Sequence, residues 1–396
     1  MKDKKIENII NIIIYHFINI ILMLGKDIFD SDLPNDEIDI YANPDVNIKK
    51  IEPETEDEFR IELSGTSIDD SVVNALRRTI LLHIPIYGFH RSNIFIEVDK
   101  SRNMYNNDML YNQIEMLVIF DIPNYYDLED PETFLSTKIM KTLFGKFIQE
   151  RHEDEDDEND ENQIHEEETK NDEEETKNDE EKKRLFKIEL SINVKNKTIN
   201  DIAVSTHDAV LKINGKIVDS YRKRSPMDII FLKPTEEISL RAEANLGIAK
   251  IHASYEATTN AILNEISPTK YILYYQTLGQ LDNDMIFSKA CTILIKKFEY
   301  LQRYISKKYK KEHEITETIE IPILGEEHTL GNLLSTVLQK CKFVEKAAYV
   351  MQHPFIDEMT IVYKLTSKSK IGPIQVLVDS IGYLIKLFKS IRQLRQ

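Results

Sequence analysis

Hydrophobic positions along this chain follow either the alternation of a strand or the spacing of a helix. The same order, a strand and then a helix, occurs twice. In the first occurrence Phe59, Ile61 and Leu63 alternate with charged residues, which predicts a strand. Apolar residues then recur at helical spacing, which predicts an amphipathic helix that ends at Pro85 and carries Ile68, Val72, Val73, Leu76 and Ile80. Ser67, with Asp70 three residues later, predicts the N-cap of this helix. A further strand is expected over residues 94–98.

Residues 315–396 repeat this order. Alternation predicts a strand at Ile319, Ile321 and Ile323, and Gly325 predicts a turn. Thr329 is expected to cap a second helix, whose apolar stripe is Leu330, Leu333, Leu334, Val337 and Leu338. Two strands are expected around a turn at His353 and Pro354, and a long amphipathic helix over residues 374–391 is expected to close the chain.

Between these units, alternation predicts several strands from Ile188 to Leu240, and helical spacing predicts a helix over residues 285–305. The charged residues 307–314 are expected to form a short linker.

Residues 150–181 hold 19 acidic and three basic residues, and so carry 16 of the 17 excess negative charges of the chain. They repeat EEETKND in tandem and lack aromatic residues, so we expect a disordered loop. The remainder is nearly neutral, which disfavours DNA binding by this chain alone.

Each of the two units has a helix whose apolar stripe is wider than a small sheet can cover. Two such units can bury their stripes against each other. The pattern therefore predicts a pseudo-symmetric dimer within one chain.

Two stretches resemble known families. SVVNALRRTILLHIP, at residues 71–85, resembles the signature of the alpha-type RNA polymerase subunits, which include the archaeal D-type protein and the third-largest subunit of eukaryotic RNA polymerase II. That resemblance continues over residues 238–257, with Gly247, His252, Ala253 and Tyr255. GEEHTLGNLL, at residues 325–334, and AYVMQHPF, at residues 348–355, resemble the archaeal L-type protein and the eleventh eukaryotic subunit. The order of the two parts on one chain looks like the fused RNA polymerase subunit of large cytoplasmic DNA viruses.

The resemblance implies an α+β fold in which two alpha-type dimerisation domains form an intramolecular pseudo-dimer, with a β-rich domain inserted in the first. The expected divisions are an N-terminal extension (1–50), the first dimerisation domain in two parts (51–123 and 245–306), the inserted domain with its disordered acidic loop at 150–183 (124–244), the linker (307–314) and the L-type dimerisation domain (315–396).

The resemblance also implies a non-catalytic assembly platform. Its partners would be two large catalytic subunits and small zinc-containing subunits, with DNA reached only through the complex and Mg²⁺ held by the largest partner. Asn74, Arg77 and Arg78 are expected to dock a large subunit. The expected intramolecular dimerisation residues are Val72, Leu76, Ile80, Leu330, Leu333, Leu334 and Val337. Structural roles are expected for Gly247, His252, His328, Gly331, Asn332, His353 and Pro354. A viral chain would work in the virion and host cytoplasm, and a cellular one in the nucleus or cytoplasm.

Other chemistry finds little support in the sequence. Cys291 and Cys341 stand alone, and no cysteine falls in residues 124–244, so no metal or other cofactor is expected on this chain. The histidines at 83, 252, 328 and 353 lack ligand-like spacing and are expected to be structural. No carboxylate cluster or P-loop indicates catalysis.

The apolar run at residues 9–24 leaves open a membrane-associated protein, a helix docked on a partner, a weakly ordered tail, or a true start at Met23. A stand-alone interaction module is the other alternative.

Overall fold

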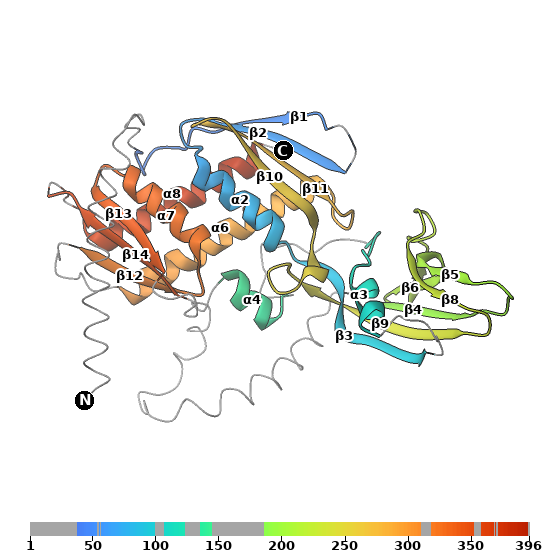
Figure 1. Cartoon of the computed structure of the whole chain (residues 1–396). Coiled ribbons are helices and arrows are strands. Elements are labelled where there is room, and N and C mark those ends of the chain that lie inside the picture. The colour runs from blue at the N-terminus through green and yellow to red at the C-terminus, as the bar shows by residue number, and fades with distance from the viewer. Residues whose placement is uncertain are drawn as a thin grey trace, which may run out of the picture.

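The computed structural model describes residues 38–53, 55, 57–99, 107–122, 135–144, 186–309, 318–351, 358–367, 369 and 371–394. These residues form an α+β structure with two separate hydrophobic cores (Figure 1). One core joins the first and last parts of the chain, and the other lies in the β-rich middle part. The predicted acidic loop, the apolar N-terminal run and the turn at His353 and Pro354 lie outside the described residues.

A four-stranded antiparallel sheet belongs to the first core, in the order β1-β2-β11-β10. Its strands are β1 (Asn47–Ile51), β2 (Glu58–Ser64), β10 (Thr258–Ser267) and β11 (Lys270–Thr277). Phe59, Ile61 and Leu63 of β2 are buried, which confirms the predicted strand. Residues of β10 and β11 pack against the helix that follows β2.

That helix, α2 (Asp70–Leu82), buries Val72, Val73, Leu76 and Ile80 of the predicted apolar stripe, and Ile68 is buried just before the helix begins. The predicted cap is wrong by two residues, because Asp69 is the N-cap and its carboxylate accepts a hydrogen bond from the Val72 N–H at 3.1 Å. The Ser67 hydroxyl instead accepts a hydrogen bond from the Tyr383 hydroxyl at 2.8 Å. The Ser67 hydroxyl, which the sequence pattern predicts as the cap of α2, therefore bonds to Tyr383 near the other end of the chain.

The β-rich unit contains a five-stranded sheet in the order β3-β9-β4-β6-β7 and a two-stranded sheet, β5-β8. The strands are β3 (Ile86–Asp99), β4 (Ile188–Lys195), β5 (Ile202–Ser205), β6 (Ala209–Ile213), β7 (Lys216–Val218), β8 (Asp228–Leu232) and β9 (Glu237–Gly247). The short η3 (Thr206–Asp208) and α3 (Asn107–Glu115) pack beside them. Strand β3 pairs with β9, and both β3 and α3 contribute to the second core. The predicted boundary at residue 124 therefore does not divide the two cores, since the second begins with β3.

The predicted helix at 285–305 is confirmed as α6 (Asn283–Lys308), and α4 (Thr137–Phe144) packs against it. Lys307 and Lys308 are helical and Tyr309 is the C-cap, so the linker predicted at residue 307 begins later. Residues 310–317 lie outside the described residues.

The C-terminal unit has a three-stranded sheet in the order β12-β14-β13 and two helices. Its elements are β12 (Ile319–Leu324), α7 (His328–Lys340), β13 (Val344–Met351), β14 (Glu358–Leu365) and α8 (Pro373–Gln393). Gly325 has a φ of 75°, a left-handed conformation that suits the predicted turn. The predicted cap is wrong here too, because Glu327 is the N-cap residue and Thr329 lies inside the first turn of α7.

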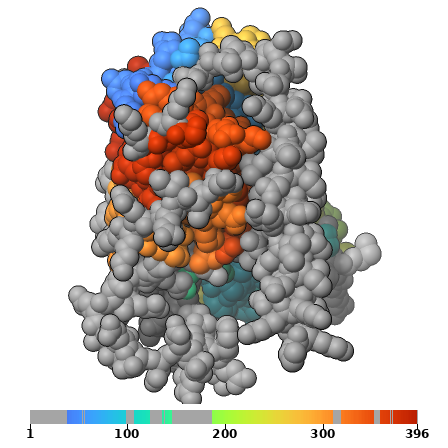
Figure 2. Space-filling model, turned by 90° about the vertical axis from the view of Figure 1, so that its left-hand side faces the viewer, coloured from blue at the N-terminus to red at the C-terminus, as the bar shows by residue number. Residues whose placement is uncertain are grey.

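The two ends of the described chain lie side by side. Figure 2 shows the blue residues next to the orange and red ones on one face of the molecule. The Ile38 N–H donates to the Lys340 carbonyl at 2.8 Å, and the Tyr41 hydroxyl donates to Asp379 at 2.7 Å. Residues 38–46 thus form a strap from the C-terminal unit to the first unit, where the Asp45 carbonyl accepts from the Ser67 N–H.

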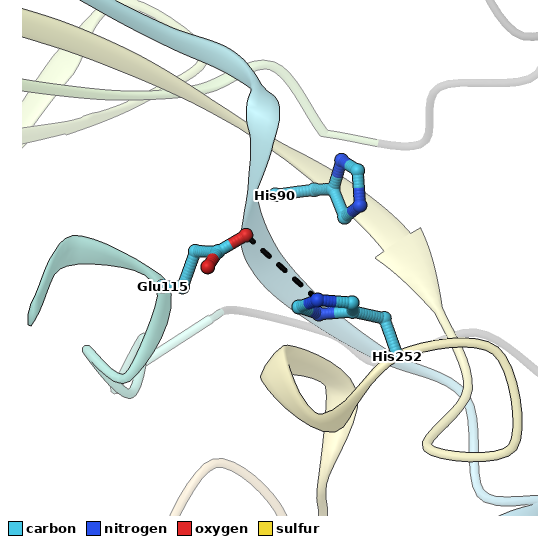
Figure 3. A group of neighbouring side chains, drawn as sticks. All are labelled: His90, Glu115 and His252. Atoms are coloured by element: carbon cyan, nitrogen blue, oxygen red, sulfur yellow. Dashed lines mark ion pairs between the residues drawn. The ribbon is translucent and has the colours of Figure 1, made fainter. Parts of the chain in front are cut away.

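The junction between the two cores brings together His90 of β3, Glu115 of α3 and His252, which precedes η4 (Ala253–Tyr255) (Figure 3). The ligand-type atoms of these three side chains all lie within 4.8 Å of one another. The Arg91 N–H donates to Glu115 Oε1 at 2.8 Å, which orients the carboxylate.

Candidate functional site

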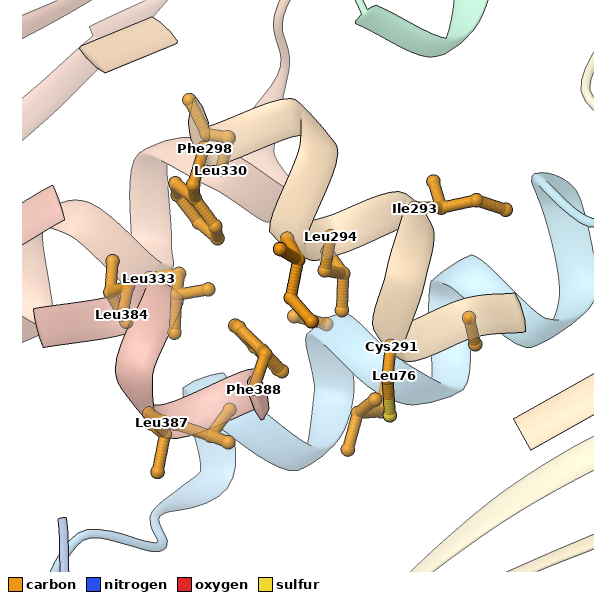
Figure 4. Close-up of a cluster of buried hydrophobic side chains, with 14 of the residues drawn as sticks. Leu76, Cys291, Ile293, Leu294, Phe298, Leu330, Leu333, Leu384, Leu387 and Phe388 are labelled. Atoms are coloured by element: carbon orange, nitrogen blue, oxygen red, sulfur yellow. The ribbon is translucent and has the colours of Figure 1, made fainter. Parts of the chain in front are cut away.

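The interface between the first and C-terminal units is the largest feature that joins distant parts of the sequence. Helix α6 packs along α8, and α2 packs on α7 (Figure 4). The Phe298 and Phe388 rings stack with centroids 6.0 Å apart and an interplanar angle of 10°. Leu76 and Cys291 lie in the same cluster, and burial raises the pKa of the Cys291 thiol to about 12, so this sulfur is a protonated, apolar group.

All of the residues expected to join the two units lie in this single core. Each is at most 2% exposed: Val72, Leu76, Ile80, Leu330, Leu333, Leu334 and Val337. Helix α2 supplies three of them and α7 supplies four. The apolar stripes that neither small sheet could cover therefore share one buried cluster.

A buried ion pair crosses the interface inside this apolar surface. Lys297 Nζ of α6 lies 2.9 Å from Glu326 Oε1 and donates to Glu326 Oε2 at 3.0 Å. The Lys297 side chain is 8% exposed and the Glu326 side chain is 4% exposed. Burial raises the pKa of Glu326, and the charge and hydrogen bond of Lys297 oppose that rise. The pair links the first unit to Glu326, which lies two residues before α7.

Further polar contacts surround this pair. Lys250 Nζ lies 2.9 Å from Glu327 Oε1, and Arg78 Nε donates to Thr329 Oγ1 at 2.6 Å. Burial tends to raise the pKa of Glu327, but the hydrogen bond from Lys250 and the neighbouring positive charges leave it lowered. Burial lowers the pKa of His83 well below its usual value, and the charges of Lys297, Lys250 and Arg78 lower it further. A neutral imidazole therefore lies among three cations.

Polar contacts also flank the apolar cluster along α8 and α7. Arg392 Nη1 donates to Thr292 Oγ1 at 3.1 Å, and Lys340 Nζ donates to Asp69 Oδ2 at 2.7 Å. Asp69 thus caps α2 and also pairs with the last turn of α7. These contacts fix how the two units are aligned, since each has a defined partner across the interface.

The residues expected to dock a large subunit all lie on α2. Arg77 donates from Nε and Nη2 to Asn74 Oδ1, at 3.0 and 2.9 Å, and both side chains are half-buried. Arg78 faces the C-terminal unit through Thr329. Docking by Asn74 and Arg77 stays a prediction, and Arg78 has a partner within the chain.

The motif glycines allow close approach of an aromatic ring in each unit. A Cβ on Gly247 would lie 2.6 Å from the Tyr255 ring, and a Cβ on Gly331 would lie 2.5 Å from Tyr349 Cδ2. His328, which is exposed, hydrogen-bonds through Nδ1 with the Tyr349 hydroxyl at 3.2 Å. Asn332 is half-buried in α7 and accepts through its carbonyl from Ser335 Oγ.

We expect Gly331→Ala to lower the free energy of unfolding by about 1–3 kcal/mol, because the new methyl group overpacks the space held by the Tyr349 ring. In a Tyr349→Ala background the same substitution should be neutral or stabilising by up to about 1 kcal/mol, since alanine has the higher helix propensity. Urea unfolding of the four chains measures this change of sign. The same loss in both backgrounds would show that the ring is not the cause.

Several interface residues were not indicated by the sequence pattern. Lys297 occupies a position within the apolar stripe of α6, between Leu294 and Leu301, and that position was the available signal. The strap at 38–46 was expected to be part of an N-terminal extension. His90 and Glu115 were not singled out, because they are 25 residues apart and lie 162 and 137 residues before His252 in the sequence.

No helix among the described residues is long and apolar enough to cross a membrane.

Residues 318–394 match the model of the RNA polymerase Rpb3/Rpb11 dimerisation domain. These residues are the C-terminal half of the interface, so the domain match and the geometry concern the same surface.

Similarity to a viral protein extends over most of the chain, and similarity to archaeal subunits covers a short part of it. A protein of Acanthamoeba polyphaga mimivirus, with the provisional name of a DNA-directed RNA polymerase subunit, is 50% identical over 364 residues, or 92% of this chain and 98% of the relative. The Rpo11 subunit of the RNA polymerase of Sulfurisphaera tokodaii is 43% identical over 63 residues, which are 16% of this chain and 66% of that protein. The Rpo11 subunit of Sulfolobus acidocaldarius is 41% identical over 63 residues, covering 16% and 68%.

The chain belongs to the family of DNA-directed RNA polymerase subunits that carry the Rpb3/Rpb11 dimerisation domain. It is an assembly-type subunit of a multisubunit RNA polymerase, and its extended similarity to the mimivirus protein indicates a virus-related enzyme.

Proposed function

We propose that this chain is a fused, non-catalytic assembly platform, in which an alpha-type part and an L-type part pair within one chain as a pseudo-dimer. The β-rich unit, which runs from β3 to β9, is inserted in the first part. The platform docks the two large catalytic subunits and small zinc-containing subunits, and Mg²⁺ chemistry belongs to the largest partner. DNA is reached only through the assembled enzyme, in the virion and host cytoplasm.

The observation that carries this proposal is the closed interface between the two units. Apolar stripes from α2, α6, α7 and α8 share one core, and Lys297 pairs with Glu326 inside it. A heterodimer of separate subunits would need the same complementary surfaces. Placing both on one chain makes their association intramolecular and independent of concentration.

Arg77 is the side chain of the expected docking group best placed to meet a large subunit. It lies on α2, half-buried, and its guanidinium is held by Asn74 within the same helix. Its planar fork can bind carboxylates or backbone carbonyls of a partner. Arg78, held by Thr329, contributes to the pairing of the two parts.

Affinity purification of the tagged full-length chain from infected cells tests the platform. We expect two large subunits at equal stoichiometry and Mg²⁺-dependent templated RNA synthesis. Arg77→Glu should reduce recovery of the large subunits by more than about tenfold, because a reversed charge at an interface costs several kcal/mol. The matched control is Arg222→Glu, whose side chain is 65% exposed in the β-rich unit.

Two results would contradict this proposal. Recovery of the wild-type chain without large subunits would contradict the role as an assembly platform. An equal reduction in recovered large subunits for Arg77→Glu and Arg222→Glu would contradict a docking role for Arg77. Unchanged thermal unfolding of the Arg77→Glu chain separates a lost contact from a lost fold.

A further inference from the structure

The cluster of His90, Glu115 and His252 has features that an ordinary hydrogen-bonded junction does not require. Three different segments supply the side chains, and the carboxylate lies beside the two histidine rings (Figure 3). Glu115 Oε1 is 4.0 Å from His252 Nε2, and the two histidine rings have centroids 4.8 Å apart. The Glu115 side chain is 11% exposed and that of His252 is 39% exposed, so the cluster is open to solvent on one side.

Both histidines have the same environment at Nδ1. His90 Nδ1 lies 2.8 Å from Ser92 Oγ, and His252 Nδ1 lies 3.0 Å from Ser254 Oγ, in each case a serine two residues later. The Ser92 and Ser254 backbone N–H groups each donate to the same Nδ1 atom, at 3.3 and 3.2 Å, so Nδ1 is an acceptor in both rings. A neutral ring that accepts at Nδ1 carries its proton on Nε2, so metal binding through Nε2 requires that proton to move to Nδ1, which then donates to the serine hydroxyl in place of the backbone N–H contact.

We propose that His90 Nε2, His252 Nε2 and a Glu115 carboxylate oxygen bind one divalent transition-metal ion, with zinc as the preferred ion. Two imidazoles and a carboxylate are a ligand set that zinc accepts, and water would complete a tetrahedral site. Metal–ligand bonds of about 2.0–2.1 Å put neighbouring ligand atoms about 3.3 Å apart, so the present separations of up to 4.8 Å must contract by side-chain rotation when the ion binds.

Groups beyond the three ligands also suit a metal. Ligating histidines commonly donate their other ring nitrogen to an acceptor, and the hydroxyl oxygens of Ser92 and Ser254 lie at hydrogen-bond distance to accept once Nδ1 carries the proton. Ligating carboxylates are themselves hydrogen-bonded, as Glu115 is by the Arg91 N–H. Binding would tie β3 and α3, which belong to the second core, to the segment that leads from β9 to β10 in the first core. The ion would therefore fix the β-rich unit relative to the dimerisation core.

The test uses the purified full-length chain after chelator treatment and dialysis. Calorimetric titration with Zn²⁺ and visible absorption on adding Co²⁺ measure binding directly. We expect one equivalent at this site, with affinity lowered at least tenfold in each of His90→Gln, Glu115→Gln and His252→Gln. His328→Gln is the matched control, because its Nδ1 also has a hydrogen-bond partner but it lies in the C-terminal unit.

Thermal unfolding separates metal binding from folding. Zinc should raise the melting temperature of the wild-type and His328→Gln chains and leave those of the three cluster variants unchanged. Far-UV circular dichroism without metal checks that the variants fold. One equivalent that persists in all three variants would place the metal elsewhere and overturn the proposal. Absence of a bound equivalent in the wild-type chain would show that the cluster is a junction of hydrogen bonds alone.

Discussion

Lys297→Met should lower the free energy of unfolding by about 3–5 kcal/mol, because it leaves the Glu326 carboxylate buried without its partner. Methionine keeps most of the volume and apolar contact of the lysine stem. The loss of unfolding free energy therefore measures the effect of removing the positive charge. Replacing both residues, as Lys297→Met with Glu326→Leu, should restore most of the stability, since no charge is then left in the core. Urea unfolding of the two variants and the wild-type chain measures this difference.

The loss in Lys297→Met should also depend on pH. Burial raises the pKa of Glu326 and Lys297 opposes that rise, so removing the lysine raises the folded-state pKa further. The folded chain then holds a proton that the unfolded chain releases above its ordinary carboxyl pKa. Because the pKa of Glu326 is already raised in the wild-type chain, stability relative to that chain should fall as the pH rises between the two raised folded-state pKa values, by up to about 1.4 kcal/mol per pH unit. The double variant should lack this dependence.

An exposed pair in the same interface serves as the matched control. Lys389 Nζ lies 3.1 Å from Glu299 Oε1, but the two side chains are 45% and 25% exposed. Lys389→Met should cost about 0–1 kcal/mol, because water screens that pair. Equal losses for Lys297→Met and Lys389→Met would contradict a decisive role for burial.

Phe388→Ala should lower the free energy of unfolding by about 3–5 kcal/mol, since it deletes a fully buried ring at the centre of the α6–α8 contact. Phe298→Ala, on the opposite helix, should have a loss in the same range. Because the two rings stack, the double variant should lose about 0.5–1.5 kcal/mol less than the sum of the single losses. Guanidinium unfolding of the four chains gives this coupling energy.

Leu394→Ala is the control for the aromatic pair, because Leu394 follows α8 and is 55% exposed. Its loss should stay within about 0.5 kcal/mol. A loss for Phe388→Ala no larger than this would show that α8 does not stabilise the first unit. Separate unfolding transitions for the two units would contradict a single shared core.

Local periodicity predicted the strand with Phe59, the helices α2, α6, α7 and α8, and the apolar faces they bury. It succeeded because side-chain period follows directly from backbone geometry. It misplaced both helix caps, since Ser67 and Thr329 make contacts across the interface with Tyr383 and Arg78. A hydroxyl that suits a cap locally can be used by a distant partner.

The sequence by itself determined the class of fold, the apolar stripes and, through its two motifs, the family to which the chain is similar. The tertiary structure decided which distant elements pair. It placed β3 beside β9, put Lys297 opposite Glu326, laid residues 38–46 across the C-terminal and first units, and brought His90, Glu115 and His252 together. The physical reason is that periodicity shows which face of an element is buried but not its partner, which depends on hydrogen bonds, shape and charge across the whole chain.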